Sequence, residues 1–368
     1  MANAEKILVR GVNWLGDAVM TTPALQRLRA AKPHAHITLL TPEKLAGLWG
    51  GHPSVDATLT FNDADSVFSV AKRLRAERFD TAVVFPNSPR SALEVFLARI
   101  PRRIGYARGG RSFLLTQALP PRAGAVKMHK RSITEIEQRI AAKVPRETFP
   151  AEAHHVHDYL QLVAALGANP LPLPPLLHVS AEEVSAARNK FHLDGPGPLF
   201  ALNPGAEYGA AKRWPAERFV EAAVELHQRS QCRWVVLGGG ADVELAGDIA
   251  KQIAARTSAT AVTSVAGRTS LRELCAVLKA CALVLTNDTG PMHVAAALGT
   301  PVVVPFGSTS PELTGPLSVP GLPHALLRGE ASCAPCFLRE CPVDFRCMKN
   351  ISIQQVVDAA LALWSARS

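Results

Sequence analysis

The chain has 368 residues, 48% of them apolar, which is enough for two domains of ordinary size and excludes a single small binding module. Its formal net charge of +9 suits an anionic partner. The basic residues are scattered in ones and twos without zinc-finger or RNP spacing, so nucleic acid is disfavoured as that partner. Because the start shows no leader-like apolar run and no apolar stretch of about 18 residues follows, we expect a cytoplasmic protein.

Apolar runs of strand length alternate along the chain with segments that have the spacing of amphipathic helices. The predicted strands are Ile7–Val9, Ile37–Leu40, Ala82–Phe85, Leu199–Leu202, Trp234–Leu237, Ala282–Leu285 and Val302–Val304. The predicted helices are Ala18–Ala31, Val67–Glu77, Ala216–Arg229, Ala241–Ala255, Leu271–Ala280, Met292–Leu298 and Ile353–Ala366. Because the strands are continuously apolar, we expect an α/β fold with parallel sheets covered on both faces.

Residues 170–175 are rich in proline, so this segment cannot form an interior helix or a central strand. We therefore expect a linker here, between a domain of residues 1–175 and a domain of residues 176–368. The second domain includes a cysteine-rich segment, 333–347, and the terminal helix. Two doubly wound, Rossmann-like domains are expected to face a central cleft at the carboxyl ends of their strands, where ligands bind.

The first predicted strand runs into a glycine-containing turn that enters a helix and carries Gly16 and Asp17. Two interpretations of Asp17 stay open. It caps the helix or favours its positive end, which contributes about 1 kcal/mol. Alternatively, it is a general base that takes a proton from an attacking hydroxyl, because a carboxylate at a strand end is well placed for that task.

The loop after strand Leu199–Leu202 combines glycines with a pair of basic side chains. Gly205 and Gly209 allow close backbone approach, and Lys212 with Arg213 supplies positive charge before a helix that Pro215 opens. This combination suits a diphosphate, although a flexible loop with solvated basic residues fits the same pattern.

A second strand-to-helix turn of the same kind follows Ala282–Leu285 and contains Asp288, Thr289, Gly290 and His293. Free amides, the helix dipole and the histidine ring would converge on an anion, whereas a simple Asp-x-Gly turn is the alternative. Two such turns in one domain favour a nucleotide diphosphate site. Between them, Glu244 suits ribose hydroxyls or is a solvated helix residue, and the glycines before it do not form a nicotinamide dinucleotide fingerprint.

Four of the seven cysteines lie near the end of the chain, at positions Cys333, Cys336, Cys341 and Cys347. Their spacing is close to that of a metal-binding cluster but is not one of the well-known zinc spacings. A structural metal site and free thiols therefore both remain open, and no neighbouring histidine in the sequence favours catalysis by these thiols.

Taken together, these motifs resemble those of the ADP-heptose lipopolysaccharide heptosyltransferases, most closely heptosyltransferase II. The resemblance spans nearly the whole chain and rests on Gly16-Asp17, residues 85–88 with Ser91-Ala92, and residues 100–105, 204–215 and 287–298. It implies a GT-B fold and an inverting transfer of heptose from ADP-L-glycero-D-manno-heptose. The acceptor would be the first heptose on Kdo and lipid A, reached at the cytoplasmic face of the inner membrane by peripheral contact, with no cofactor required for catalysis.

The resemblance also implies roles for matching residues. Asp17 would be the base, Lys212 would neutralise the diphosphate and Asp288 would lie near the donor sugar. The remaining donor-binding positions would be Gly205, Glu244, Thr289, Gly290 and His293. The acceptor-binding positions would be Asn87, Ser88, Arg90, Arg102 and Arg103, although each arginine alone also fits a solvated surface charge.

Three alternatives to heptosyltransferase II remain. Heptosyltransferase I shares the fold, donor and base but acts on Kdo–lipid A. A GT-B nucleotide-sugar epimerase would consume the donor without an acceptor. A basic anion-binding protein would bind DNA or anionic lipid in a salt-dependent manner and would not respond to ADP.

Overall fold

The computed structural model describes residues 4–317 and 323–366, which divide into two compact units. The first unit contains the residues up to Ala125 together with Glu152–His178, and the second contains Val126–Ala151 together with the residues from Val179 onward. Each unit has its own sheet of six parallel strands. Among the described residues, no helix is long and apolar enough to cross a membrane.

The first sheet has the strand order β3-β2-β1-β4-β5-β6, the order of a Rossmann domain. Its strands are β1 Lys6–Arg10, β2 His36–Pro42, β3 Ala57–Phe61, β4 Thr81–Val84, β5 Arg102–Tyr106 and β6 Gln117–Leu119. Its main helices are α1 Leu15–Met20, α2 Thr22–Ala31, α3 Val67–Glu77, α4 Pro89–Leu97 and α6 Val156–Ala164. Helices α3 and α4 pack together over apolar side chains of β1, β2 and β4, while α2 packs against α6.

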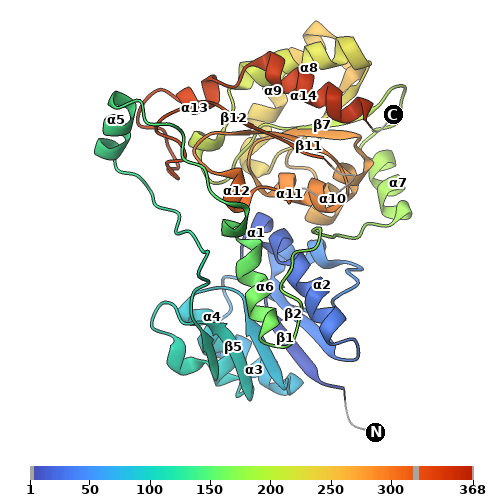
Figure 1. The fold of residues 1–368 in the computed structure, drawn as a ribbon. Helices are drawn as coiled ribbons and strands as arrows, with labels where there is room; N and C mark the ends of the chain where they lie inside the picture. Colours follow the sequence, from blue (N-terminus) through green and yellow to red (C-terminus); the bar gives the residue numbers. More distant parts are fainter. Residues whose placement is uncertain (1–3, 318–322, 367–368) are drawn as a thin grey trace. The chain divides into compact units, whose positions relative to one another are not determined.

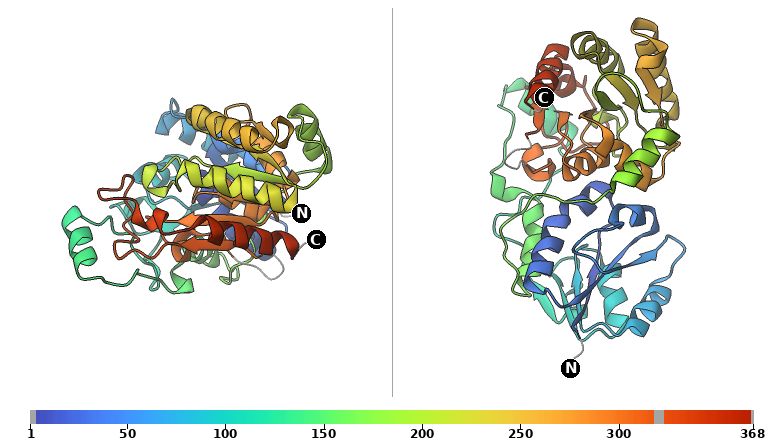
Figure 2. Two further views of the ribbon diagram at one scale, coloured as in Figure 1. Left: turned by 90° about the horizontal axis from the view of Figure 1, so that it is seen from above. Right: turned by 90° about the vertical axis from the view of Figure 1, so that its right-hand side faces the viewer.

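The second sheet, β12-β11-β10-β7-β8-β9, repeats the same order within its own numbering. Its strands are β7 Leu199–Asn203, β8 Arg233–Val236, β9 Val262–Ser264, β10 Leu283–Thr286, β11 Val302–Phe306 and β12 Ala325–Arg328. Its helices are α5 Ile133–Ala141, α7 Ala181–Lys190, α8 Ala216–Ser230, α9 Val243–Arg256, α10 Leu271–Ala280, α11 Gly290–Ala297, α12 Pro311–Thr314, α13 Arg346–Lys349 and α14 Ile353–Ser365. Helices α8, α9 and α14 lie on one face of the sheet and α10, α11 and α12 on the other (Figure 1). The first three run side by side (Figure 2).

All seven predicted strands are confirmed, with ends shifted by no more than two residues. The short strands β3, β5, β6, β9 and β12 were not predicted, because few of their residues are buried and apolar. The predicted helix Ala18–Ala31 is wrong as a single element. It is divided between α1 and α2 because Pro23 has no amide for the carbonyl of Val19, which accepts from the Thr22 hydroxyl at 2.8 Å instead.

The units differ from the predicted domains 1–175 and 176–368 in two places: residues 126–151 pack with the second unit, and residues 176–178 belong to the first. Helix α5 in segment 126–151 begins with a capping box at Ser132 and buries Ile136 in the core of the second unit. The proline-rich segment 170–175 forms neither helix nor strand, as predicted. It is held along α2, where Gln26 donates to the carbonyl of Pro174 at 2.8 Å, and the chain passes to the second unit after His178.

Candidate active site

Each sheet has one point where the strand order reverses, between β1 and β4 in the first unit and between β7 and β10 in the second. Connections on the two sides of such a switch point leave in opposite directions, so a crevice forms at the carboxyl ends of these strands. Asp17 and the residues from Asn87 to Arg90 follow the strands at the first switch point. Lys212 and Asp288 follow those at the second. Most of the candidate residues predicted from the sequence therefore lie beside a switch point.

At the second switch point, the buried Asn287 joins the two loops. Its Nδ2 donates to the carbonyl of Pro204 at 2.7 Å, and its Oδ1 accepts from the amide of Trp214 at 2.9 Å. One strand position earlier, Asn203 donates to the Thr286 hydroxyl at 3.0 Å. The sequence analysis did not single out Asn287, although a buried asparagine beside two glycine turns is the signal that would have identified it.

Lys212, predicted as a catalytic residue, and Asp288, predicted as a donor-binding residue, form an ion pair with 2.6 Å between Nζ and Oδ2. Both side chains are largely buried, with 14% and 4% exposed. Burial opposes ionisation of Asp288, but the charge of Lys212 and hydrogen bonds from Lys212 and Thr309 outweigh it and hold the pKa of Asp288 below its ordinary value. The lowered pKa keeps the Asp288 carboxylate charged, and the Lys212 ammonium that pairs with it keeps donor capacity for an anion.

Helix α11 begins beside this pair. Thr289 is its N-cap residue in an extended conformation, Gly290 is its first residue, and no side-chain hydrogen bond caps it. His293 is buried and lies close enough to Asp288 to influence its ionisation. The first-turn amides and the Lys212 ammonium therefore supply positive electrostatic potential at one place, which suits a phosphate.

Gly205 lies at the start of the loop after β7, and Glu244 lies in helix α9. A Cβ at Gly205 would lie 2.5 Å from the carboxylate of Asp242, so the close approach that this glycine permits is to that side chain. Asp242 also pairs with Arg213 at 3.6 Å. Glu244 is exposed in the first turn of α9. A pocket of about 340 Å³ lies between the Gly205 loop and this helix and includes Trp214 and Leu245.

Asp17 lies in the first turn of α1, where Trp14 and not Asp17 is the N-cap residue. The first turn of a helix favours a carboxylate, so the helix-dipole interpretation remains compatible with this position. The Asp17 carboxylate acts to raise the pKa of two nearby groups, the imidazole of His155, which is the N-cap residue of α6, and the phenol of Tyr159 within α6. Burial lowers the pKa of His155, while Asp158 and Asp17 act in the opposite direction. Neither His155 nor Tyr159 was predicted as a site residue from the sequence.

The loop after β4 is fixed by Arg111, which is 1% exposed and donates to the carbonyls of Pro86 and Ser88. Burial lowers the pKa of Arg111 to about 10. Ser88 is the N-cap residue of α4 and accepts from the Ser91 amide at 3.3 Å. Asn87, Ser88 and Arg90 are exposed, so their side chains are accessible to a ligand even though Ser88 also has a capping role.

The expectation that Arg102 and Arg103 share a site with Arg90 is wrong. Both lie at the amino end of β5, where Arg102 is level with Thr81, the first residue of β4. Arg90 follows the opposite end of β4, a four-residue strand whose two ends are about 10 Å apart at the rise of a strand. The guanidinium groups are used by the fold: Arg102 donates to the carbonyl of Ala165, and Arg103 donates to that of Leu114, at 2.9 and 2.8 Å.

A buried ion pair that the sequence analysis missed lies under the first switch point. Arg10, the last residue of β1, pairs with Glu94 of α4 at 2.9 Å, and the two side chains are 2% and 0% exposed. Arg10 also stacks 4.3 Å from the ring centroid of Phe61. A pocket of about 490 Å³ opens beside it and is lined partly by Lys44 and Arg90. The sequence feature that could have identified this pair is a single arginine at the end of an apolar strand.

The four C-terminal cysteines are free, and the thiols of Cys333, Cys336 and Cys347 are buried. Burial, together with the three neighbouring thiols, raises the pKa of Cys347 to about 12. In the described ranges 4–317 and 323–366, no three His, Cys, Asp or Glu side chains are grouped to hold a metal ion. The structural-metal interpretation therefore finds no support in this arrangement.

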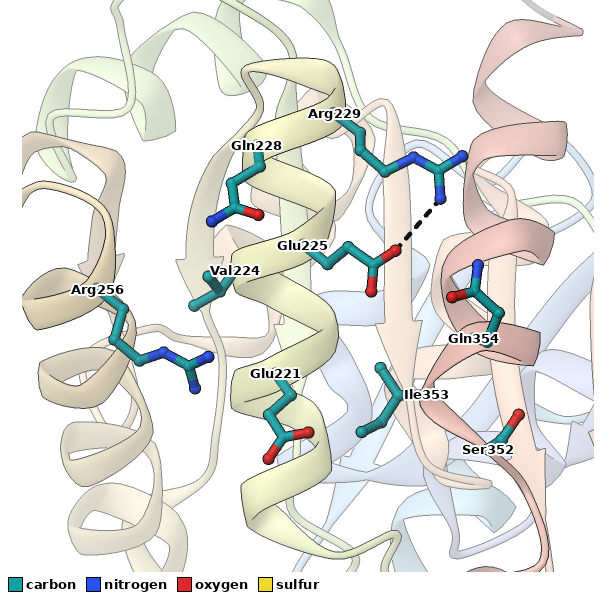
Figure 3. Close-up of a pocket in the computed structure, with 9 residues that line it drawn as sticks. All are labelled: Glu221, Val224, Glu225, Gln228, Arg229, Arg256, Ser352, Ile353 and Gln354. Atoms are coloured by element: carbon teal, nitrogen blue, oxygen red, sulfur yellow. Dashed lines mark hydrogen bonds and ion pairs between the residues drawn. The ribbon is translucent and has the colours of Figure 1, made fainter.

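A groove of about 840 Å³ on the outer helices of the second unit contains none of the predicted site residues. It lies among α8, the end of α9 and the start of α14, with Glu225 and Arg229 paired at 3.2 Å on its wall (Figure 3). Its lining mixes charges of both signs with the apolar side chains of Val224 and Ile353. These are features of a solvated helical surface, so we do not assign it to the active site.

Comparisons with known proteins agree with this geometry. Residues 112–345 match the model of glycosyltransferase family 9 (heptosyltransferase). The lipopolysaccharide heptosyltransferase 2 of Escherichia coli K12 is 33% identical over 85% of this chain and 86% of its own. The lipooligosaccharide heptosyltransferase 2 of Haemophilus influenzae is 29% identical over 88% and 89%.

The solved structure of E. coli ADP-heptose lipopolysaccharide heptosyltransferase II superimposes with a TM-score of 0.78. It is 29% identical, and the match covers 98% of this chain and 99% of that one. The predicted GT-B fold, built from two Rossmann-like domains, is thereby confirmed. The chain is a glycosyltransferase that belongs to glycosyltransferase family 9, the heptosyltransferases.

Proposed function

We propose that this enzyme is a heptosyltransferase II, which transfers L-glycero-D-manno-heptose from ADP-heptose to the first heptose of the lipopolysaccharide inner core with inversion. The ion pair of Lys212 and Asp288 at the second switch point carries the donor half of the proposal. The acceptor half rests on the relatives, whose names specify the second heptosyltransferase.

On the donor side, the departing ADP gains negative charge as the glycosidic bond to its β-phosphate breaks. The Lys212 ammonium and the amides at the start of α11 offset that charge, and Asp288 holds the ammonium in place. We assign the pocket lined by Pro204 and Leu245 to the nucleoside, and Gly205 and Glu244 are the chain neighbours of these two residues. Since protein groups supply this stabilisation, no cofactor or metal ion takes part in the proposed reaction.

On the acceptor side, Asp17 takes the proton from the attacking hydroxyl while the oxygen of that hydroxyl forms a bond to the anomeric carbon. Attack opposite the leaving group inverts that carbon in one displacement, so one base is sufficient. Asn87, Ser88 and Arg90 remain the proposed acceptor contacts because they are exposed at the first switch point. Lys44, in the pocket beside Arg90, is an additional cation for the acidic inner core.

The acceptor, heptosyl-Kdo2–lipid A, is anchored in a membrane by its lipid. We therefore place the reaction at the cytoplasmic face of the inner membrane, with the protein in peripheral contact. The net charge of +9 favours that contact with an anionic surface.

The decisive experiment measures heptose transfer from ADP-heptose to purified acceptors that end in Kdo alone or in one heptose. Transfer only to the heptose-ended acceptor is the expected result. Transfer to the Kdo-ended acceptor would identify heptosyltransferase I instead. Consumption of the donor without either acceptor would identify an epimerase, and salt-sensitive binding to DNA without any response to ADP would identify an anion-binding protein.

A further inference from the structure

The loop that carries Lys212 is held from outside by residues 331–339. The Tyr208 hydroxyl donates to the carbonyl of Phe337 at 2.8 Å, and the amide of Ala211 donates to the carbonyl of Arg339 at 2.9 Å. The guanidinium of Arg339 lies 5.3 Å from the ring centroid of Tyr208. Two backbone carbonyls of one segment thus fix both ends of the turn before Lys212.

Gly209 shows how closely the two segments approach. Its φ is +151°, and a Cβ there would lie 2.4 Å from the carbonyl oxygen of Arg339 and 2.9 Å from the Arg339 Cβ. No side chain fits at that distance without moving the backbone of one segment. The sequence analysis treated this glycine as a means of approach to a phosphate, but its neighbour is the segment 331–339.

Tyr208 connects this contact to the charge pair. The Lys212 ammonium lies 4.9 Å from the centroid of the Tyr208 ring while it pairs with Asp288. A cation over an aromatic face is attracted by the ring, which limits the positions that the long lysine side chain adopts. The ring therefore restrains the ammonium, and its hydroxyl restrains the ring.

Segment 331–339 is itself fixed by residues 126–151. Arg131 is buried and donates from Nη1 to the carbonyl of Cys333 at 3.0 Å and from its amide to that of Cys336 at 3.1 Å. Arg139 donates to the carbonyl of Ser332 at 2.9 Å. These bonds hold a segment that has no helix or strand of its own.

The same residues 126–151 also reach the Asp288 side of the pair. Arg146 donates to the carbonyls of Gly307, Thr309 and Gly329 at 2.9 to 3.3 Å. Thr309 in turn donates from its hydroxyl to Asp288 at 2.6 Å. Both members of the charge pair are therefore supported by one set of contacts.

We propose that residues 126–151 and 331–339 form a brace that fixes the Lys212–Asp288 pair for the donor diphosphate, with Tyr208 and Gly209 as its positioning residues. The inference rests on the proposed function, because Lys212 is taken there as the cation of the diphosphate. It adds a role for a segment that the predicted domain boundary assigned to the first domain and for a cysteine-rich segment without an assigned role.

A double-mutant cycle on the full-length protein tests the brace, with ADP binding measured by titration calorimetry. Gly209→Ala should weaken ADP binding about tenfold, and this loss should disappear when Lys212 is already alanine, because the brace acts through that ammonium. Gly247→Ala is the matched control, since a Cβ at this position in α9 meets no atom within 4 Å apart from its own stretch of helix. It should leave ADP binding unchanged in both backgrounds.

An equal loss from Gly209→Ala with and without Lys212, or no loss in either, would overturn the brace. If Gly209→Ala fails to fold, Tyr208→Leu replaces it in the same cycle, because it removes the ring and its hydroxyl without steric conflict. Absence of ADP binding in the unmodified protein would instead contradict the proposed function. The two failures are therefore distinguishable.

Discussion

The two switch points differ in how their loops are held. In the second unit the loops are tied to each other through Asn287, and an ionised pair is fixed between them. In the first unit each loop has its own buried arginine: Arg10 donates to the carbonyl of Gly11, and Arg111 donates to those of Pro86 and Ser88. There, the buried charges serve the backbone and the exposed side chains are left for a ligand.

This difference means that the donor-binding loops are preorganised by contacts with each other, whereas each loop on the acceptor side is held separately. Substitutions at the second switch point should change stability and ligand binding together, because the same groups serve both. Substitutions of exposed residues at the first should change turnover or acceptor affinity and leave stability nearly intact. The following predictions test that separation.

The largest effect is expected at the first switch point. Asp17→Asn should lower the rate of heptose transfer about 1,000-fold, since the amide cannot accept the proton of the acceptor hydroxyl. ADP affinity and the midpoint of thermal unfolding should change little. Single-turnover kinetics and calorimetry would measure these quantities, and retention of transfer would exclude Asp17 as the base.

A smaller loss of turnover, about 100-fold, is expected for Lys212→Ala, but donor binding and stability should fall with it. The substitution leaves the buried Asp288 carboxylate without its partner, which should cost about 3 kcal/mol in the free energy of unfolding. Adding Asp288→Asn should recover stability without recovering turnover. Recovery of both in the double variant would show that Lys212 serves the fold alone.

Asn287→Ala should lower the free energy of unfolding by about 2 kcal/mol, because the Pro204 carbonyl and the Trp214 amide lose their buried partner. ADP binding should weaken as the two loops separate. Asn189→Ala on the exposed face of α7 is the control and should affect neither quantity. Chemical denaturation would measure the free energy of unfolding of both variants. Equal values would contradict the role of Asn287 in joining the two loops.

The sequence alone predicted the architecture because buried parallel strands are continuous apolar runs, and each switch point was visible as a glycine turn after such a run. It did not predict that Lys212 contacts Asp288, since 76 positions separate them. Arg102 and Arg103 were grouped with Arg90 because strand β5, which begins with these two charged residues, was not predicted. The position of residues 126–151 was missed because the core that α5 covers is formed by distant parts of the chain.

The smallest effect concerns the electrostatic contact between Asp17 and His155. Burial lowers the pKa of His155 from its ordinary value, and the Asp158 and Asp17 carboxylates oppose that shift by favouring the imidazolium. Asp17→Asn should therefore lower the pKa of His155 further, and NMR titration of the imidazole protons would measure the change. Spectra of a His157→Gln variant would identify the His157 signals, so that the His155 signals can be followed separately.

The sign of the linked stability follows from the same shift. A histidine whose pKa is lowered by folding is held neutral, so its contribution is fully present above the unfolded pKa of about 6.5 and is lost as pH falls through the folded value. Asp17→Asn should extend that loss to lower pH. An unaltered His155 pKa in Asp17→Asn would show that the two side chains do not interact electrostatically.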